Sequence, residues 1–259
     1  MTALNPRTVR ALLALGAIAL SAILSTQARA QAPAVDPAAT QALKRMTDYL
    51  GSLKQFSVHT QVTVEDLLTT GQRIDEDVSA SMTVSRPNKV RAERKGGLND
   101  QNFYYNGKTL TLYNASANAY AAQPMPATIE GMLDYARESL GLSIPASDLV
   151  YPNAYQLLMQ DVTSAVVLGK AVIGTVKCDH LLFSRPGVDF QVWIADAGRP
   201  LPYKYVVTDR GNPGWMSIAT VMSDWNVSPE VTDARFTFVP PKGAKRVEFM
   251  PLDAGTSRR

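Results

Sequence analysis

The side chains that could carry out chemistry are few, and their spacing does not suit catalysis. Cys178 and His180 lie two residues apart in a predicted strand, so they point to the same face and could supply two metal ligands. A metal site needs at least one further ligand, and the sequence holds no other clustered motif of metal-binding residues. We therefore expect no metal, and we interpret Cys178 as a small buried residue of the sheet.

Hydrolytic catalysis is not indicated either. The sequence has no serine in a Gly-x-Ser-x-Gly turn, and His180 directly follows Asp179, so these two side chains face opposite sides of a strand. The acidic residues Asp75, Glu76 and Asp77 lie close to a predicted turn, where a solvated strand face explains them better than paired acid and base roles. We expect a protein that is not an enzyme and that needs no cofactor.

Methionines are the remaining residues of chemical interest, because their flexible thioethers adapt to irregular apolar partners. Met82 and Met132 are candidates for contacts with an apolar ligand, and Met159, Met216 and Met222 belong to the same group. Ordinary packing in a protein core is the alternative interpretation for all of them.

The first 30 residues have the pattern of a secretory signal peptide. Arg7 and Arg10 precede an unbroken apolar run over residues 11–24, and Ala28 and Ala30 place small side chains where a signal peptidase cleaves. The apolar run is shorter than the segment of about 20 residues that crosses a membrane as a helix. The pattern predicts cleavage after Ala30 and export from the cytoplasm.

Export changes the charge balance of the chain. The whole sequence has 26 basic and 23 acidic residues, and the leader holds three arginines and no acidic residue. The mature chain is therefore formally neutral, whereas proteins that bind nucleic acid carry a clustered surplus of lysine and arginine. We expect no nucleic-acid partner.

The mature chain is expected to be one soluble periplasmic domain and a monomer. Cys178 is the only cysteine, so no internal disulfide forms, and Gln31 stands where a bacterial lipoprotein would carry its lipidated cysteine. No linker or low-complexity segment divides residues 31–250. The tail over residues 251–259 has little to bury and is predicted to be disordered.

Hydrophobic periodicity predicts a mainly β protein with a few helices. Asp36 and Pro37 begin an amphipathic helix, and further helices are predicted over residues 128–140 and 153–160. From residue 56 the period changes to two, which predicts a hairpin with Val62 and Met82 on its apolar face. The other predicted strands cover residues 89–95, 101–105, 109–113, 119–122, 165–168, 172–183, 188–194, 203–209, 215–225 and 235–239. Strands on both sides of a helical middle predict a large antiparallel sheet with helices over its apolar face.

Two sets of segments resemble known families. Residues 85–88 (SRPN), 105–114 (YNGKTLTLYN) and 233–243 (DARFTFVPPKG) are similar, in order and spacing, to signatures of LolA-like periplasmic lipoprotein carriers. Residues 178–183 (CDHLLF), 189–194 (DFQVWI) and 200–202 (PLP) resemble more closely a sister group of predicted periplasmic proteins of unknown function.

The resemblance implies a strongly curved, incomplete β-barrel of about eleven antiparallel strands, covered by about three helices, whose apolar concave side holds acyl chains. It also implies that Arg86, in the Arg-Pro-Asn turn, helps to hold the helical lid closed. Residues 141–149 depart from the carriers, which leaves the cargo open. The candidate ligand-binding residues are Arg86, Val62, Met82, Leu112, Met132, Phe190 and Val192.

Two functions follow from this architecture. The first is a periplasmic carrier or binding protein for a lipid or another acylated molecule, since an empty cavity of several hundred Å³ would cost on the order of 10 kcal/mol. Each buried methylene would return about 0.8 kcal/mol, so cargo could drive the opening of a lid. The second function is an envelope sensor or interaction module with a protein partner and no lipid transport. An ordinary packed core under the same helices is the structural alternative.

Overall fold

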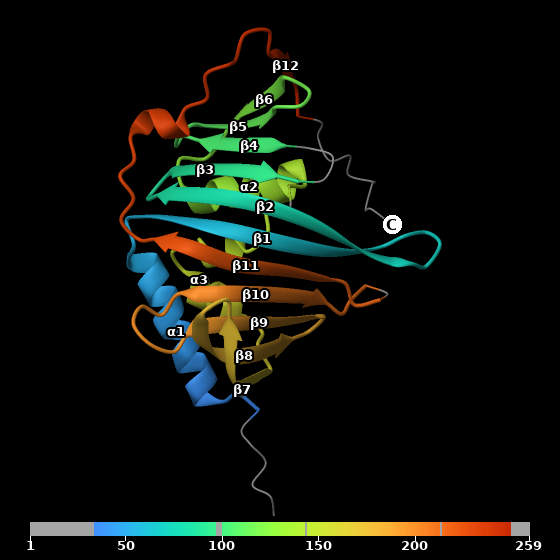
Figure 1. Ribbon diagram of the computed structural model, residues 1–259, viewed down its shortest axis with the longest axis vertical. Helices are drawn as coiled ribbons and strands as arrows, with labels where there is room; N and C mark the ends of the chain where they lie inside the picture. Colours follow the sequence, from blue (N-terminus) through green and yellow to red (C-terminus); the bar gives the residue numbers. More distant parts are fainter. Residues whose placement is uncertain (1–33, 97–99, 143, 213, 250–259) are drawn as a thin grey trace, which may run out of the picture. The chain divides into compact units, whose positions relative to one another are not determined.

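The computed structural model describes residues 34–96, 100–142, 144–212 and 214–249. The predicted leader over residues 1–30 and the predicted disordered tail over residues 251–259 lie outside these ranges, and both stay predictions. The described chain forms one twelve-stranded sheet in the order β12-β6-β5-β4-β3-β2-β1-β11-β10-β9-β8-β7 (Figure 1). The strands are β1 (Gln55–Leu67), β2 (Arg73–Ser85), β3 (Lys89–Lys95), β4 (Gln101–Tyr105), β5 (Thr109–Asn114), β6 (Ala119–Pro124), β7 (Ser164–Ile173), β8 (Val176–Arg185), β9 (Val188–Ala195), β10 (Pro202–Asp209), β11 (Ser217–Asn226) and β12 (Lys245–Val247).

The sheet is antiparallel except at one edge, and it does not close. Strand β12 pairs with β6 in parallel, every other pair of neighbours is antiparallel, and β12 and β7 form the two open edges. This confirms the prediction of a curved, incomplete barrel covered by helices, with twelve strands in place of about eleven. Strand β1 joins the two halves of the sheet, because it pairs with β2 on one side and with β11 on the other.

Side-chain alternation in the central hairpin gives the sheet one apolar face. Phe56 pairs with Val84 and Val62 pairs with Val78, and all four side chains are buried on the same face. The turn between the two strands contains Gly71, whose φ of 83° lies in the left-handed region that glycine adopts without strain. The hairpin predicted from the period of two is therefore present, and its predicted inward-facing side chains are the buried ones.

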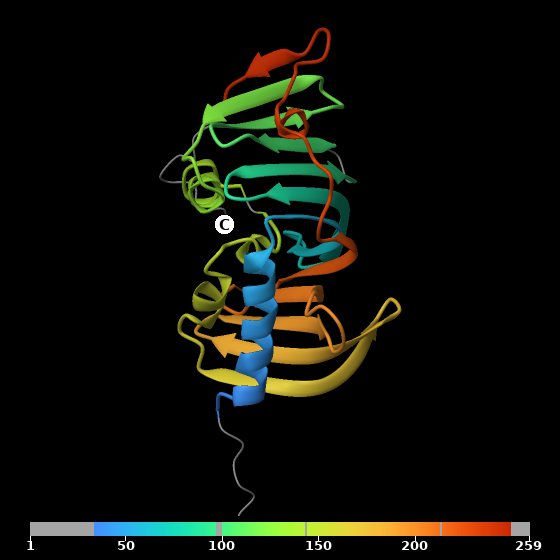
Figure 2. The ribbon, with the colours of Figure 1, turned by 90° about the vertical axis from the view of Figure 1, so that its left-hand side faces the viewer.

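Three α-helices lie over the apolar face in the described part of the chain, as expected. They are α1 (Pro37–Ser52), α2 (Ile129–Leu140) and α3 (Ala154–Met159), and a short 3₁₀ helix, η1 (Ser147–Leu149), precedes α3. The predicted cap is present, since Asp36 Oδ1 accepts a hydrogen bond of 2.8 Å from the backbone N–H of Ala38. Figure 2 shows α1 lying across the half of the sheet that contains β7 to β10, with α2 against the other half.

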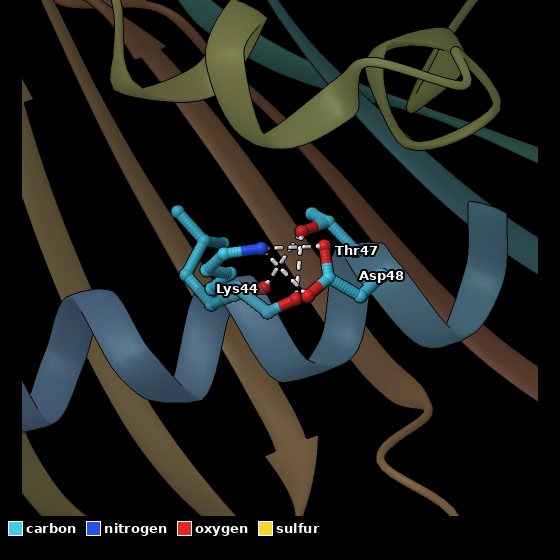
Figure 3. Close-up of polar contacts among 4 residues, drawn as sticks. Lys44, Thr47 and Asp48 are labelled. Carbon is cyan, nitrogen blue, oxygen red and sulfur yellow. Dashed lines mark hydrogen bonds and ion pairs between the residues drawn. The ribbon is translucent and has the colours of Figure 1, made fainter. Parts of the chain in front are cut away.

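Helix α1 separates an apolar face from a charged one. Leu43, Met46 and Leu50 are almost fully buried against the sheet. On the other face, Lys44 Nζ lies 2.7 Å from Asp48 Oδ2 one turn along the helix, as Figure 3 shows. Both charged side chains are more than half exposed, so this pair contributes about 0.3–0.5 kcal/mol, and burial of the apolar face holds the helix in place.

The half of the sheet under α1 has a solid core. The rings of Phe183 and Phe190 stack with centroids 4.7 Å apart and planes 6° apart. Both are at most 1% exposed, and Leu181 and Val192 beside them are fully buried. The space between α1 and these strands is therefore filled by the protein's own side chains.

Two strand predictions were wrong. The strand expected over residues 172–183 is divided by a tight turn at residues 174 and 175, where the φ of Gly174 is 59°. Residues 172 and 173 therefore belong to β7 and residues 176–183 to β8. Residues 235–239 were expected to form the last strand. Instead a second 3₁₀ helix, η2 (Asp233–Phe236), lies there, and the last strand is β12.

The segment from η2 to β12 crosses the outer face of the sheet. Lys89 Nζ on β3 lies 2.5 Å from Asp233 Oδ1, and the ring of Phe238 contacts three tyrosine rings of β4, β5 and β6 at centroid distances of 5.0–5.3 Å. These contacts explain why residues 235–239 do not pair as a strand. The tyrosines are Tyr104, Tyr113 and Tyr120.

Candidate functional site

A cavity of about 410 Å³ lies between the sheet and its helical cover. Its floor is the inner face of β1 to β5 and β11, and its roof consists of residues from α1, α2, η1 and the segments next to η1. We call it the main cavity. Its side chains from β1 are Phe56, Val58, Thr60, Val62 and Val64, and its side chains from β2 are Glu76, Val78, Ala80 and Met82.

The cavity exists because small side chains occupy the middle of its floor. Thr60 on β1 pairs with Ala80 on β2, and Ala92 on β3 pairs with Met82. All four line the cavity, and two of them are alanines; on its other side Ala92 pairs with Phe103, which has a much larger side chain. The floor runs from Phe56 to Val64, which at about 3.3 Å per residue is a length of about 26 Å.

The two ends of the main cavity differ in polarity. Phe56, Tyr105 and Trp225 line one end, and the only polar side-chain groups among them are the hydroxyl of Tyr105 and the ring N–H of Trp225. Glu76 and Arg94 are the two charged side chains of the lining, and their register partners, Val64 and Ala80, place them toward the other end. Glu76 is exposed, so this end of the cavity reaches solvent.

Helix α2 is anchored beside the apolar end. The hydroxyl of Tyr105 donates to the carbonyl oxygens of Pro126, at 2.5 Å, and of Thr128, at 3.1 Å, and Thr128 is the N-cap of α2. Burial, with a smaller contribution from Glu130, raises the pKa of Tyr105 to about 12. Because the neutral hydroxyl makes both bonds, the anchor is intact throughout the physiological pH range.

A second anchor ties α2 to the segment before α3. The hydroxyl of Tyr151 donates to Asp134 Oδ1 at 2.8 Å, and Arg137 Nη2 lies 2.8 Å from the same oxygen. Burial and this hydrogen bond raise the pKa of Tyr151. The roof of the cavity is therefore held by two tyrosines, one at the N-terminus of α2 and one at its middle.

Arg86 occupies the turn between β2 and β3, next to the start of α2. The following peptide bond, to Pro87, is cis, and the carbonyl oxygen of Pro87 accepts a hydrogen bond of 3.1 Å from Ile129 N, the first residue of α2. The side-chain atoms Nε and Nη2 of Arg86 are buried, and neither has a hydrogen-bond partner among the described residues. Burial lowers the pKa of Arg86, and the negative charge of Glu130 partly offsets this effect.

The structure places three of the seven candidate ligand-binding residues in the lining of the main cavity, namely Val62, Met82 and Met132. Arg86 lies beside the N-terminus of α2, outside the lining. Phe190 and Val192 belong to the solid core under α1, and Leu112 lies on the inner face of β5 without lining the cavity. Strand periodicity had placed these side chains on the inner face, but it does not indicate where a helix fills the space above them.

Sequence reasoning missed the small and charged residues of the site. Ala80 and Ala92 create the space, and Glu76 was interpreted as part of a solvated strand face. The signal for Glu76 was available, because it shares its parity along β2 with Val78 and Met82 and therefore points to the inner face.

Catalytic and metal-binding chemistry is not apparent in the described residues. They contain no group of three or more His, Cys, Asp or Glu side chains that could hold a metal ion. Cys178 is buried, and burial raises the pKa of its thiol to about 11, which disfavours the reactive thiolate. His180 stacks on Trp193 with centroids 4.0 Å apart and contacts Gln191 at 2.9 Å.

No helix in the ranges that the structure describes is long and apolar enough to span a membrane.

Comparison with known proteins identifies one matching family model. The model described as "Predicted periplasmic protein (DUF2092)" matches residues 39–250. The sequence matches none of the curated proteins with which it was compared.

Several solved structures are similar in fold. LprF from Mycobacterium bovis is 16% identical with a TM-score of 0.48, and 82% of this chain and 99% of that chain are covered. An uncharacterized conserved protein from Thermus thermophilus is 14% identical with a TM-score of 0.46 and the same coverage. A LolA superfamily protein from Nitrosomonas europaea is 11% identical with a TM-score of 0.39, and 77% of this chain and 97% of that chain are covered. With identities and TM-scores this low, these likenesses carry no argument about function.

Proposed function

The chain belongs to the DUF2092 family of predicted periplasmic proteins, and we propose that it is a periplasmic carrier or binding protein for a lipophilic or acylated ligand. The ligand lies in the main cavity, between the inner face of the sheet and helix α2. No catalytic step is part of this function, because binding uses the shape and the apolar area of the cavity.

The volume and lining of the main cavity are the observation that carries this proposal. A volume of about 410 Å³ falls within the range of about 300–1,000 Å³ that is typical of small-molecule sites. Only Glu76 and Arg94 of its lining side chains are charged, so the site suits a ligand that is apolar over most of its length. Within the main cavity itself, charged side chains are confined to the end that reaches solvent.

The energetics of an empty cavity support the same function. At about 24 cal/mol per Å³, leaving this volume empty would cost on the order of 10 kcal/mol if it were fully dry. That is comparable to the whole free energy of unfolding of a domain, about 5–15 kcal/mol. An acyl chain returns about 0.8 kcal/mol for each methylene that it buries, so a chain of twelve or more carbons offsets a cost of this order.

Lipid release from the purified protein tests the proposal. Protein isolated from periplasm without detergent is extracted with organic solvent, and the extract is examined by mass spectrometry. We expect about one acylated molecule per chain. Delipidated protein should then bind a fluorescent fatty acid, and an unlabelled fatty acid should displace it.

Failure in both assays would overturn the proposal. If neither released lipid nor fatty-acid binding is found, the cavity does not serve an acylated ligand. A defined envelope protein that cross-links to the chain equally with and without lipid would then favour the sensor or interaction function.

A further inference from the structure

A second pocket, of about 300 Å³, lies beside the main cavity. Leu133 on α2, residues 144–147 before and within η1, and Ile218 on β11 line both spaces, so they share one wall. We call this space the side pocket. Its own lining residues are Arg137, Gly141, Leu142, Asp148, Tyr205, Val207 and Thr220.

The side pocket differs from the main cavity in its chemistry. It presents one positive and one negative side chain, Arg137 and Asp148, together with the hydroxyl groups of Ser147, Tyr205 and Thr220. The wall between the side pocket and the main cavity is apolar apart from Ser147. A ligand that occupied both spaces would therefore place one part in the apolar main cavity and another part in the side pocket, which carries both charges.

Asp148 has spare capacity to accept hydrogen bonds. It lies in η1, and its one hydrogen bond in the described structure comes from the hydroxyl of Tyr205 to Oδ2, at 3.4 Å. It forms no ion pair there within 4.0 Å. An ionised carboxylate accepts at about four lone-pair positions, so Asp148 can bind a cationic donor without losing Tyr205.

Arg137 keeps free donors toward the pocket. It lies in the last turn of α2, and both of its acidic neighbours, Asp134 at 2.8 Å and Glu138 at 3.9 Å, are contacted through Nη2. A guanidinium has five N–H donors and binds phosphate oxygens in a fork geometry. Tyr151 also interacts with this guanidinium, but the side chain is half exposed, so further N–H donors remain for a ligand.

We propose that the side pocket binds the zwitterionic headgroup of a phospholipid-like ligand whose acyl chain lies in the main cavity. The ammonium group of the headgroup binds Asp148, and its phosphate binds Arg137. This inference rests on the proposed function, because it assigns the polar part of the same ligand. A headgroup with a phosphate alone would leave Asp148 unpaired, and a fatty acid would bring a carboxylate toward a site that already holds one.

Three probes separate the headgroup from the acyl chain. They are lysophosphatidylethanolamine, lysophosphatidic acid and lauric acid, with twelve-carbon chains throughout, and their affinities for the delipidated full-length mature protein are measured by calorimetry below their critical micelle concentrations. The unchanged protein should bind lysophosphatidylethanolamine about tenfold more tightly than lysophosphatidic acid.

Two variants assign the charges. Asp148→Asn keeps an acceptor for Tyr205 and removes the charge, so it should weaken the binding of lysophosphatidylethanolamine about tenfold. It should not weaken the binding of lysophosphatidic acid or lauric acid, because both lack an ammonium group. Arg137→Gln should weaken both phosphate-bearing probes and leave lauric acid unchanged. Asp75→Asn, which removes an equal charge from the outer face of β2, is the matched control and should alter no affinity.

The outcomes distinguish this inference from the proposed function. If all three probes bind with equal affinity, or if Asp148→Asn weakens all three equally, the headgroup site is overturned while the main cavity remains a lipid site. If none of the three binds, the proposed function fails, and the headgroup site fails with it. Circular dichroism and thermal unfolding of each variant show whether the fold is retained.

Discussion

The guanidinium of Arg86 is the least satisfied charge near the roof of the main cavity. Two of its nitrogens are buried without a hydrogen-bond partner in the described structure, and its pKa is lowered by that burial. A buried charge without a partner destabilises the folded state. The latch implied by family resemblance stays a prediction, and the two unbonded nitrogens point to an opposing effect, because their burial costs free energy when α2 is closed.

Replacement of this arginine should stabilise the protein. Arg86→Leu removes a partly buried charge that has two unbonded nitrogens and only the nearby charge of Glu130 to offset its burial, so we expect the free energy of unfolding to rise by about 1–3 kcal/mol. Exchange of a bound fluorescent fatty acid should become slower, because the closed state gains stability. Chemical denaturation and stopped-flow displacement measure the two effects.

Arg91 provides the matched control. It is 8% exposed, but its guanidinium donates to Phe103 O and lies 3.7 Å from the ring centroid of Tyr104, on the outer face. Arg91→Leu should therefore lower stability. If Arg86→Leu also lowers stability and speeds exchange, Arg86 holds the lid closed, and the interpretation of its charge as unsatisfied is wrong.

Tyr105 connects the anchor of α2 to pH. Its pKa is raised from 10 to about 12 in the folded state, so the stability that it contributes is fully present below pH 10 and is lost as the pH rises through 12. Unfolding followed between pH 8 and 12 should show this loss. In Tyr105→Phe the decline should be shallower and stability at pH 8 lower by about 1 kcal/mol, because the bonds to Pro126 and Thr128 are absent. If stability declined equally with pH in the unchanged protein and in Tyr105→Phe, the loss at high pH would come from other tyrosines.

The C-terminal segment is the element that depends most on contacts distant in sequence. Phe238 packs among Tyr104, Tyr113 and Tyr120, and β12 then adds to the edge of β6. Phe238→Ala should lower the free energy of unfolding by about 1–3 kcal/mol and increase hydrogen exchange in β12. Val239→Ala is the control, because Val239 is 78% exposed. Unchanged exchange in β12 would show that the strand holds its place without the aromatic contacts.

Most elements of this fold could be predicted from local patterns. The caps and apolar stripes of α1 and α2 and the alternation of the β1–β2 hairpin depend on residues close together in the chain, so the sequence shows them directly. The C-terminal segment could not be predicted in this way. Residues 235–239 alternate like a strand, but tyrosines more than 100 positions earlier hold Phe238, and no local pattern reports that contact.

The site could be predicted only in part, because a cavity depends on how sheet and helices are placed together. Strand alternation put Val62 and Met82 on the inner face, where they line the cavity, and put Phe190 on the same face, where α1 and the core fill the space. The difference between the two halves is set by Ala80 and Ala92 and by the position of each helix. Small residues leave a hollow only when nothing above them is large enough to fill it.

A hollow of this kind gives opposite effects on stability and on binding, which provides a test at the scale of the whole molecule. Ala92→Leu fills the floor of the main cavity from β3. Because the added carbons become buried in existing space, the free energy of unfolding of the delipidated protein should rise by about 2 kcal/mol, while the affinity for a fatty acid should fall at least tenfold.

A leucine placed outside the cavity separates filling from overpacking. Ala219→Leu adds the same side chain on the outer face of β11, opposite Thr63, and should change neither quantity appreciably. Overpacking at residue 92 would lower stability by about 1–3 kcal/mol instead, and would mean that the space above Ala92 is too small for a leucine. A more stable Ala92→Leu protein that still binds fatty acid with full affinity would place the ligand elsewhere. Greater stability with weaker binding can arise together only if the ligand and the new side chain compete for one volume.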